Sequence, residues 1–326
     1  MSLSKLPDEL LFMICEKLAK VRDLVAFSCC SKRLNLICKE VNYINNVYVI
    51  DKNDNCKENS INSVLEFNKN LRIHLDLSSC KILDVSMYGN TYILKLSNCY
   101  YISDVSKLSK VHTLDLSYCD SLEDVSMLGN VHNLNLSSCS RISDVSNLGN
   151  VHTLDLSYCK NITDVSMLGN VHTLNLAVCY NLSDVSMLGK VDTLFLMRCH
   201  KIKDVSMLGN VHTLNLSSCG SISDVSKLGN VYNLNLSYCE KISDVSMLGN
   251  VHTLNLAVCY NISDVSKLGN VFDLNLTCCH GITDVSMLGN INTLNLTGCR
   301  NIHDVSELSN IKKLNLSWCE IIINLN

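Results

Sequence analysis

Cysteine recurs through most of the chain at a fixed interval. After one step of 19 residues from Cys80, the spacing from Cys99 to Cys319 is 20 residues throughout, and Asp follows in step from Asp84 to Asp304. A typical unit is VHTLNLSSCGSISDVSKLGN, residues 211–230. Self-similarity at one fixed period is typical of a solenoid or a propeller, and a four-stranded propeller blade needs about 40 residues. The repeat therefore predicts a solenoid.

Each unit has the pattern of one short strand. Leu214 and Leu216 alternate with Thr213, Asn215 and Ser217, and this period of two indicates a strand with one buried face. The polar residues should then form an exposed strand face. Stacked units pair strand with strand at about 4.8 Å.

The rest of the unit indicates how the chain turns back. Val211, Ile222, Val225 and Leu228 are spaced to face the interior of a coil that turns once per repeat. Asp224 should cap a single helical or 3₁₀ turn by accepting a bond from a free backbone N–H. Gly229 and Asn230 should close the unit, because both residue types tolerate positive φ.

The pattern VHTLNLSSCGSI resembles the leucine-rich repeat of the cysteine-containing type, with Val211 in the first apolar slot. The resemblance covers residues 71–326, about 13 repeats. It implies an α/β repeat solenoid, a leucine-rich-repeat arc with a parallel β-sheet on the concave face. It also implies that the repeated Cys are buried structural residues. Units of 20 residues leave room for only one convex helical turn, so we expect a thin, weakly curved arc.

The first 40 residues do not repeat. They resemble the F-box, a small domain of three helices. The matching residues are Leu6, Pro7, Glu9, Leu10, Ile14, Leu18, Asp23, Leu24, Cys30, Lys32 and Arg33. Two departures from the family are a short loop at residues 19–22 without the common Pro, and Leu34 where an aromatic residue is frequent.

The F-box resemblance implies a partner. F-boxes bind a Skp-type adaptor, which links them to a cullin and to ubiquitin transfer. The apolar residues that would contact the adaptor are Leu6, Pro7, Leu10, Leu11, Ile14, Leu18 and Leu24.

Residues 41–70 should form an N-terminal capping segment, with a strand at residues 47–50 and a helix from Ser60. This segment would shield the first apolar layer of the solenoid. The alternative for this segment is a flexible linker.

Composition excludes several classes of function. The 27 basic and 31 acidic residues give a net charge of −4, which does not favour nucleic acid or an anionic membrane as a partner. No apolar run reaches the roughly 18 residues of a membrane helix. Asp8 and Glu9 interrupt what would be a signal sequence, so we expect an intracellular, cytoplasmic protein with reduced Cys. Richness in Asn, Ile and Lys with one Pro is typical of an AT-rich genome, such as that of a large DNA virus, whose protein would act in the host cytoplasm.

Catalytic and metal sites are not indicated. No G-x-S-x-G, H-E-x-x-H or phosphate-binding loop occurs, so we expect no enzyme activity and no cofactor. The Cys series could in principle bind metal, but no Cys-x-x-Cys pair is present. His112, His132, His152 and His172 also form a file that could bind metal, yet the same slot holds Asp192 and Tyr232. We therefore expect no metal ion.

Target binding should use the strand face. The repeat at 191–206, VDTLFLMRCHKIKDVS, departs from the others by placing an apolar pair beside a basic cluster, which is the composition of an interaction hot spot. Drift in a tolerant repeat is the alternative. The expected target-binding residues are Phe195, Met197, Arg198, His200, Lys201, Tyr158, Tyr238 and Trp318.

Two functions remain open from the sequence. The first is a substrate-recognition subunit of an SCF-type ubiquitin ligase, and the second is a non-catalytic repeat scaffold or interaction protein without a ligase role. A secreted adhesin or immune receptor is disfavoured, because Asn-Leu-Ser/Thr sequons such as those at Asn215 and Asn235 lie on the strand face. Glycans there would cover the binding surface.

Overall fold

The structure is a computed structural model that describes Pro7, Leu11 and residues 47–51 and 72–320. The chain falls into two compact units, Met1–Cys139 and Ser140–Asn326. The expected capping helix from Ser60 and nearly all of the expected F-box lie outside the described residues. Within the described part, no helix has the length and apolar character needed to cross a membrane.

The first unit contains five strands that pair in parallel in sequence order. They are β1 (Val47–Asp51), β2 (Arg72–Asp76), β3 (Ile93–Lys95), β4 (Thr113–Asp115) and β5 (Asn133–Asn135). The 3₁₀ turns are η2 (Ser86–Tyr88) and η3 (Ser126–Leu128). Strand β1 confirms the strand predicted at residues 47–50, and it pairs with β2. The capping role of residues 41–70 stays a prediction.

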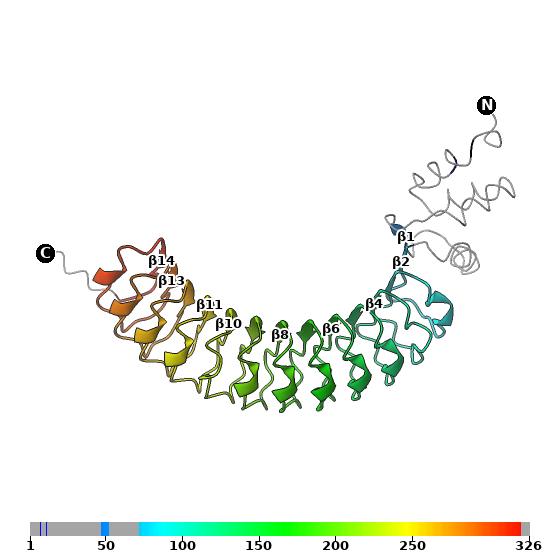
Figure 1. The fold of residues 1–326 in the computed structure, drawn as a ribbon, viewed down its shortest axis with the longest axis horizontal. Coiled ribbons are helices and arrows are strands. Elements are labelled where there is room, and N and C mark those ends of the chain that lie inside the picture. Colours follow the sequence, from blue (N-terminus) through cyan, green and yellow to red (C-terminus); the bar gives the residue numbers. More distant parts are fainter. Residues whose placement is uncertain (1–6, 8–10, 12–46, 52–71, 321–326) are drawn as a thin grey trace. The chain divides into compact units, whose positions relative to one another are not determined.

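The second unit continues the pattern with nine parallel strands, each paired with the next in register. They are β6 (Thr153–Asp155), β7 (Thr173–Asn175), β8 (Thr193–Phe195), β9 (Thr213–Asn215), β10 (Asn233–Asn235), β11 (Thr253–Asn255), β12 (Asp273–Asn275), β13 (Thr293–Asn295) and β14 (Lys313–Asn315). The 3₁₀ turns are η4 (Ser146–Leu148), η5 (Ser166–Leu168), η6 (Ser186–Leu188), η7 (Ser206–Leu208), η8 (Ser246–Leu248), η9 (Ser266–Leu268), η10 (Ser286–Leu288) and η11 (Ser306–Leu308). Within this unit the strands line the inner side of a curve and the turns its outer side (Figure 1).

The interior of each repeat is the apolar layer that the sequence predicts. Leu214, Leu216, Ile222 and Leu228 are at most 1% exposed, and the same slots are buried in repeat after repeat. Cys219 completes the layer at 0% exposure. Each repeat closes its core only against the next one, as expected of a solenoid.

The turn after the core confirms one expectation and corrects another. Asp224 Oδ1 accepts the Ser226 N–H at 2.9 Å, so the repeated Asp does cap the turn. Gly189, however, has a φ of −65°, and Gly229 and Asn230 are likewise not at positive φ. Glycine is required because a Cβ at Gly189 would lie 2.3 Å from the carbonyl oxygen of Met207 in the next repeat. Close stacking, and not a left-handed turn, decides this position.

Candidate functional site

The strand face is less open than the sequence suggests. Thr213 and Asn215 are half-buried and Ser217 is buried, because each strand is flanked by the strands of two neighbouring repeats. Asn215 also has a local role, since its Oδ1 accepts the Ser217 N–H at 3.0 Å. The corresponding Asn in other repeats makes the same bond, as at Asn235 and Asn255. The Asn file thus caps the strands, and its side chains are half-buried where the sequence predicted an exposed face.

The left-handed position falls immediately before each ladder Cys. This slot has a φ near +60° in the described repeats and is filled by Ser79, Asn98, Tyr118, Ser138, Tyr158, Val178, Arg198, Ser218, Tyr238, Val258, Cys278 and Trp318, with Gly298 as its glycine. A left-handed conformation costs roughly 1–2 kcal/mol for a residue with a Cβ, and a β-branched residue there is an outlier. Gly298 and Asn98 show that unstrained residues are accepted in this slot.

The predicted target-binding residues divide between two places. Phe195 ends β8 half-buried on the strand face, and Met197 follows it with 38% of its surface exposed. Arg198 occupies the left-handed slot of the same repeat. Tyr158 and Tyr238 occupy that slot two repeats before and two repeats after Arg198, about 10 Å away on each side. Trp318, six repeats from Arg198, is 85% exposed and does not belong to this cluster.

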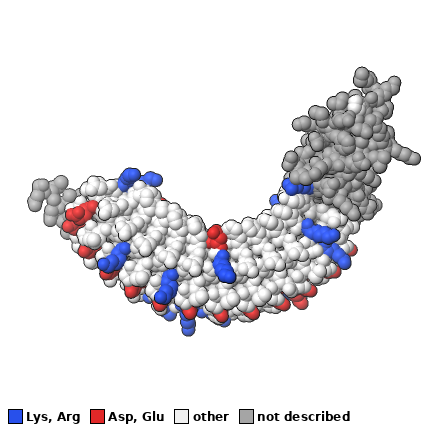
Figure 2. Space-filling model, in the orientation of Figure 1, with Lys and Arg blue, Asp and Glu red and all other residues white. Residues whose placement is uncertain are grey.

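Neighbouring side chains hold the basic end of the cluster in place. The Lys201 Nζ donates to the Asn181 Oδ1 at 2.8 Å. The imidazole of His200 stacks on Tyr180, with ring centroids 5.9 Å apart and an interplanar angle of 6°. Arg198, His200 and Lys201 are all exposed. Figure 2 shows how few charged side chains interrupt the visible face of this unit.

Two residues next to this cluster, Tyr180 and Val178, are not among the predicted target-binding residues. Tyr180 is the stacking partner of His200 and is 40% exposed. Val178 is buried in the left-handed slot between those of Tyr158 and Arg198. The recurrence of Ala-Val-Cys-Tyr at 177–180 and 257–260 is the signal that could have identified both.

The repeated Cys form a hydrogen-bonded ladder. Cys219 Sγ donates to the carbonyl oxygen of Leu196 in the preceding repeat at 3.1 Å, and burial raises the pKa of this thiol to about 12. Cys99 to Cys299 in the ladder are buried, whereas Cys80 and Cys319 at its two ends are half-buried. The expectation that all thirteen are buried was therefore wrong at the two ends of the ladder.

The rings of the His file contact one another across neighbouring repeats. His152 and His172 meet edge to face, with ring centroids 4.7 Å apart and an interplanar angle of 86°, and other pairs in this slot stack. In the first unit the rings of His112 and His132 stack at 4.7 Å with an interplanar angle of 11°. In the second unit His212, Tyr232, His252 and Phe272 stack in sequence at 5.0, 4.4 and 4.7 Å. Among the described residues, no group of three or more His, Cys, Asp or Glu side chains is arranged to hold a metal ion.

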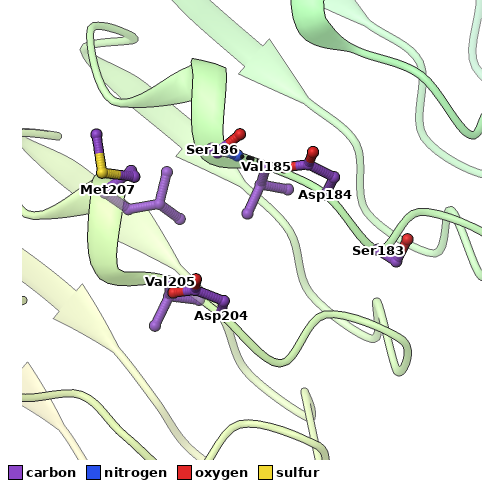
Figure 3. Close-up of a pocket in the computed structure, with 8 residues that line it drawn as sticks. Ser183, Asp184, Val185, Ser186, Asp204, Val205 and Met207 are labelled. Carbon is purple, nitrogen blue, oxygen red and sulfur yellow. Dashed lines mark hydrogen bonds between the residues drawn. The ribbon is translucent and has the colours of Figure 1, made fainter.

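The turn side of the second unit carries an acidic row. A hollow of about 370 Å³ lies between the turns of Asp184 and Asp204, with Met207 at its rim (Figure 3). Ser186 N–H donates to Asp184 Oδ1 at 2.9 Å, and this bond lowers the pKa of the Asp184 carboxyl. The carboxylates are thus committed to capping turns. The hollow brings together the same residue types as other gaps between repeats, so it does not mark a special site.

Two of the predicted adaptor-binding residues are described. Pro7 is exposed, Leu11 is buried, and the Leu11 N–H donates to the Pro7 carbonyl at 3.2 Å, which is the i to i−4 bond of an α-helical turn. Leu6, Leu10, Ile14, Leu18 and Leu24 lie outside the described residues. Adaptor binding therefore stays a prediction.

Comparison with known proteins identifies the fold. A family model described as Leucine Rich repeat matches residues 150–168. A search of curated proteins found no significant match. The InlF internalin of Listeria monocytogenes is 18% identical over 97% of this chain and 99% of that one, with a TM-score of 0.61. LIC12759, a leucine-rich-repeat protein of Leptospira interrogans, is 16% identical over 98% of this chain and 88% of that one, with a TM-score of 0.60.

A third structure shares a particular feature. The functional domain of InlJ from Listeria monocytogenes is 20% identical over 89% of this chain and 65% of that one, with a TM-score of 0.57, and it is described as including a cysteine ladder. At these identities the likeness concerns the fold alone. The described part of the chain has a solenoid fold like that of leucine-rich-repeat proteins, and its own repeated Cys form a ladder.

Proposed function

We propose that this chain is a non-catalytic substrate-recognition subunit of an SCF-type ubiquitin ligase. The strand face of the second unit would bind a target protein, and the N-terminal segment would bind a Skp-type adaptor and, through it, a cullin. The protein would act inside the cell, where a reducing environment keeps the ladder thiols free. A host cytoplasm would meet this condition if the chain is viral.

The main support for target binding is a substitution at the end of the strand in the repeat at 191–206. Phe195 replaces the Asn or Asp that caps the end of the strand in most other described repeats, as at Asn215 and Asp155, and a phenyl ring has no acceptor for that backbone N–H. A typical hydrogen bond contributes about 1 kcal/mol. The repeat thus gives up a stabilising bond and gains apolar surface at Phe195 and Met197. Loss of local stability in exchange for a contact surface is typical of a binding site.

The charges around this surface favour an acidic target. Arg198, Lys201 and Lys203 follow the apolar pair in the chain and are exposed, and basic residues near an apolar contact surface steer an acidic segment toward it. Asp192 is paired with His172, with Nδ1 and Oδ2 3.7 Å apart. The carboxylate of Asp192, which precedes β8, also accepts a hydrogen bond from the Thr193 hydroxyl at 3.1 Å.

The adaptor half of the proposal rests on the order of residues at the N-terminus. Leu6, Pro7, Glu9 and Leu10 open the F-box pattern, and Ile14 and Leu18 continue its apolar stripe. The helical bond between Leu11 and Pro7 is consistent with a helix that begins at the Pro, where its missing N–H has no cost.

The test of the ligase role is adaptor binding by the full chain. The wild-type chain, co-expressed with a Skp-type adaptor and a cullin, should co-purify with both. Replacement of Leu10 and Ile14 by Glu should abolish this, because charges at an apolar contact lack partners. The matched control is Leu83→Glu, which changes an exposed Leu of the solenoid, 73% exposed, and should leave adaptor binding intact.

The alternative is a scaffold without a ligase role. It predicts that the wild-type chain does not bind the adaptor although the repeats are folded. Retained binding by the Leu10→Glu, Ile14→Glu chain would equally contradict the F-box assignment. Neither result would bear on target binding by the strand face, which is tested separately.

A further inference from the structure

The second unit contains the same aromatic surface twice. Tyr158, Val178, Tyr180 and His200 form what we call the first aromatic patch. Tyr238, Val258, Tyr260 and His280 form the second aromatic patch, each residue 80 positions, or four repeats, further along the chain. Neighbouring strands lie about 4.8 Å apart, so the two patches are separated by about 19 Å.

The two patches share their geometry as well as their residues. His280 stacks on Tyr260 with ring centroids 5.6 Å apart, as His200 stacks on Tyr180 at 5.9 Å. The Asn after each tyrosine donates to a backbone carbonyl of the preceding repeat, as Asn181 does to Lys160 at 2.8 Å, but this bond recurs at other repeats, such as Asn161, and is not specific to the patches. The stacked Tyr and His rings are therefore the geometry that the two patches share.

Both patches retain residues that the backbone disfavours. Tyr and Val occupy the left-handed slot in each patch, where Gly or Asn would relieve strain. Val is a particular outlier because it is β-branched, and the described repeats place Val in this slot only at 178 and 258. Strain of this kind occurs at binding sites. Recent duplication explains that the patches are alike but does not explain the unfavourable residue types.

The repeat between the two patches has small side chains in the slots that hold large ones within the patches. The intervening repeat places Ser218 and Gly220 in the slots that hold Val178 and Tyr180 one patch earlier. A Cβ added at Gly220 would meet nothing within 4 Å. A chain laid along this row would therefore contact an aromatic ridge, cross open space and contact a second ridge.

We propose that the two aromatic patches together bind one extended segment of the target, which inserts an aromatic or large apolar side chain at each patch. An extended strand rises about 3.3 Å per residue, so 19 Å corresponds to about six residues. The even number places both anchoring side chains on the same face of the strand. This inference specifies the ligand of the target-binding half of the proposed function and rests on that half.

The charges give the segment a direction. Beside the first patch lie the exposed cations Lys160, Arg198 and Lys201. The equivalent positions beside the second patch are Glu240, Cys278 and Gly281. The anchor that binds the first patch should therefore be flanked by acidic residues, and the other anchor should not.

The experiment measures how the full chain binds synthetic peptides that contain two Phe residues. Their offset is four, six or eight residues, the other residues are Ser and Gly, and two Asp flank one Phe. The offset of six should bind at least tenfold more tightly than the other two, because only that offset reaches both patches. Equal affinities, or no binding of the six-residue offset at about 1 mM, would overturn the inference.

Variants assign the binding to the patches. Tyr158→Asn with Tyr180→Ser, and Tyr238→Asn with Tyr260→Ser, should each reduce affinity for the six-residue offset tenfold or more and remove the preference for that offset. Asn in the left-handed slot relieves strain, so these chains should fold. The control is Tyr118→Asn, which changes an equally exposed Tyr in the same slot outside both patches and should not affect affinity. These peptide measurements do not involve the adaptor. Their failure would therefore overturn the two-patch inference and leave the adaptor-binding proposal to its own co-purification test.

Discussion

At the scale of single residues, the stacking of repeats decides how reactive each Cys side chain is. Sulfur at the ladder position is a hydrogen-bond donor to the preceding repeat, and its burial keeps it protonated. Cys278 has the same side chain one position earlier, where the left-handed backbone leaves it half-buried. Reactivity thus depends on the slot and not on the residue type.

We predict that brief alkylation of the native protein at about pH 8 will label Cys278 and spare the ladder Cys from Cys99 to Cys299. Thiols with a pKa raised far above their usual value of about 8.5 hold almost no thiolate at this pH. Mass spectrometry before and after denaturation measures the labelling. Rapid labelling of Cys219 or Cys239 in the native chain would show that the ladder does not face the interior.

A second prediction at this scale concerns glycine. Gly189→Ala should lower the free energy of unfolding by about 1–3 kcal/mol, because its Cβ would meet the Met207 carbonyl at 2.3 Å. Gly220→Ala is the matched control, since its Cβ would meet nothing within 4 Å. Urea unfolding of the two variants measures both effects. Equal midpoints would contradict the close-stacking explanation for glycine in this turn.

At the scale of the repeat, stability and binding make opposite demands on the end of the strand. Asn215 caps its strand, whereas Phe195 cannot. The repeat at 191–206 should therefore be less stable at this point than its two neighbours, in which Asn175 and Asn215 provide the cap.

Restoration of the cap tests this trade between stability and binding. Phe195→Asn should raise the free energy of unfolding by about 1 kcal/mol. Combined with Met197→Ser, it should weaken target binding by about 2 kcal/mol. Thermal unfolding and a binding titration against the purified target measure the two quantities. Unchanged affinity together with increased stability would indicate that this repeat is drift.

The capping turns predict how the solenoid responds to acid. Hydrogen bonds from the Ser N–H groups lower the pKa of turn-capping Asp carboxyls, for example at Asp184, Asp204 and Asp224. Because the folded pKa lies below the unfolded value of about 3.9, the unfolded state binds more protons as the pH falls. The stabilisation is fully present above about pH 4 and is lost as the pH falls through the folded pKa.

Urea unfolding at a series of pH values should therefore show a midpoint that falls steeply below about pH 4. Replacement of Asp184, Asp204 and Asp224 by Asn retains a capping acceptor and should make this fall shallower. A midpoint with the same pH dependence in the triple variant would show that other carboxyls govern acid unfolding.

At the scale of the whole molecule, the folding of a solenoid depends on keeping complete repeats in register more than on the number of repeats. Each repeat contacts only its neighbours, so removal of one complete unit should leave the remaining contacts in place. Deletion of residues 211–230 joins Asn210 to Val231, the same pair of residue types that occurs at Asn230 and Val231. Deletion of residues 211–220 would instead join two half-units.

We predict that the chain lacking 211–230 folds, and that the chain lacking 211–220 does not retain the native circular dichroism spectrum. The first deletion also brings the aromatic patches to three repeats, about 14 Å, apart. The preferred offset of the peptide anchors should then change from six residues to about four. A folded deletion chain that still prefers six would show that the patches do not bind the peptide together.

The sequence by itself determined the solenoid, the inward Val, Leu and Ile, the capping Asp and the buried Cys ladder, because a strict period repeats one local solution and removes ambiguity about which residues are equivalent. Only the tertiary structure decided the left-handed slot, the structural role of Asn215, the reason for Gly189 and the half-buried ends of the ladder. These depend on the distance between backbones in adjacent repeats, which no single repeat encodes. The likeness between the two aromatic patches belongs to both levels, because the residues recur in the sequence but their stacking on neighbouring rungs exists only in the fold.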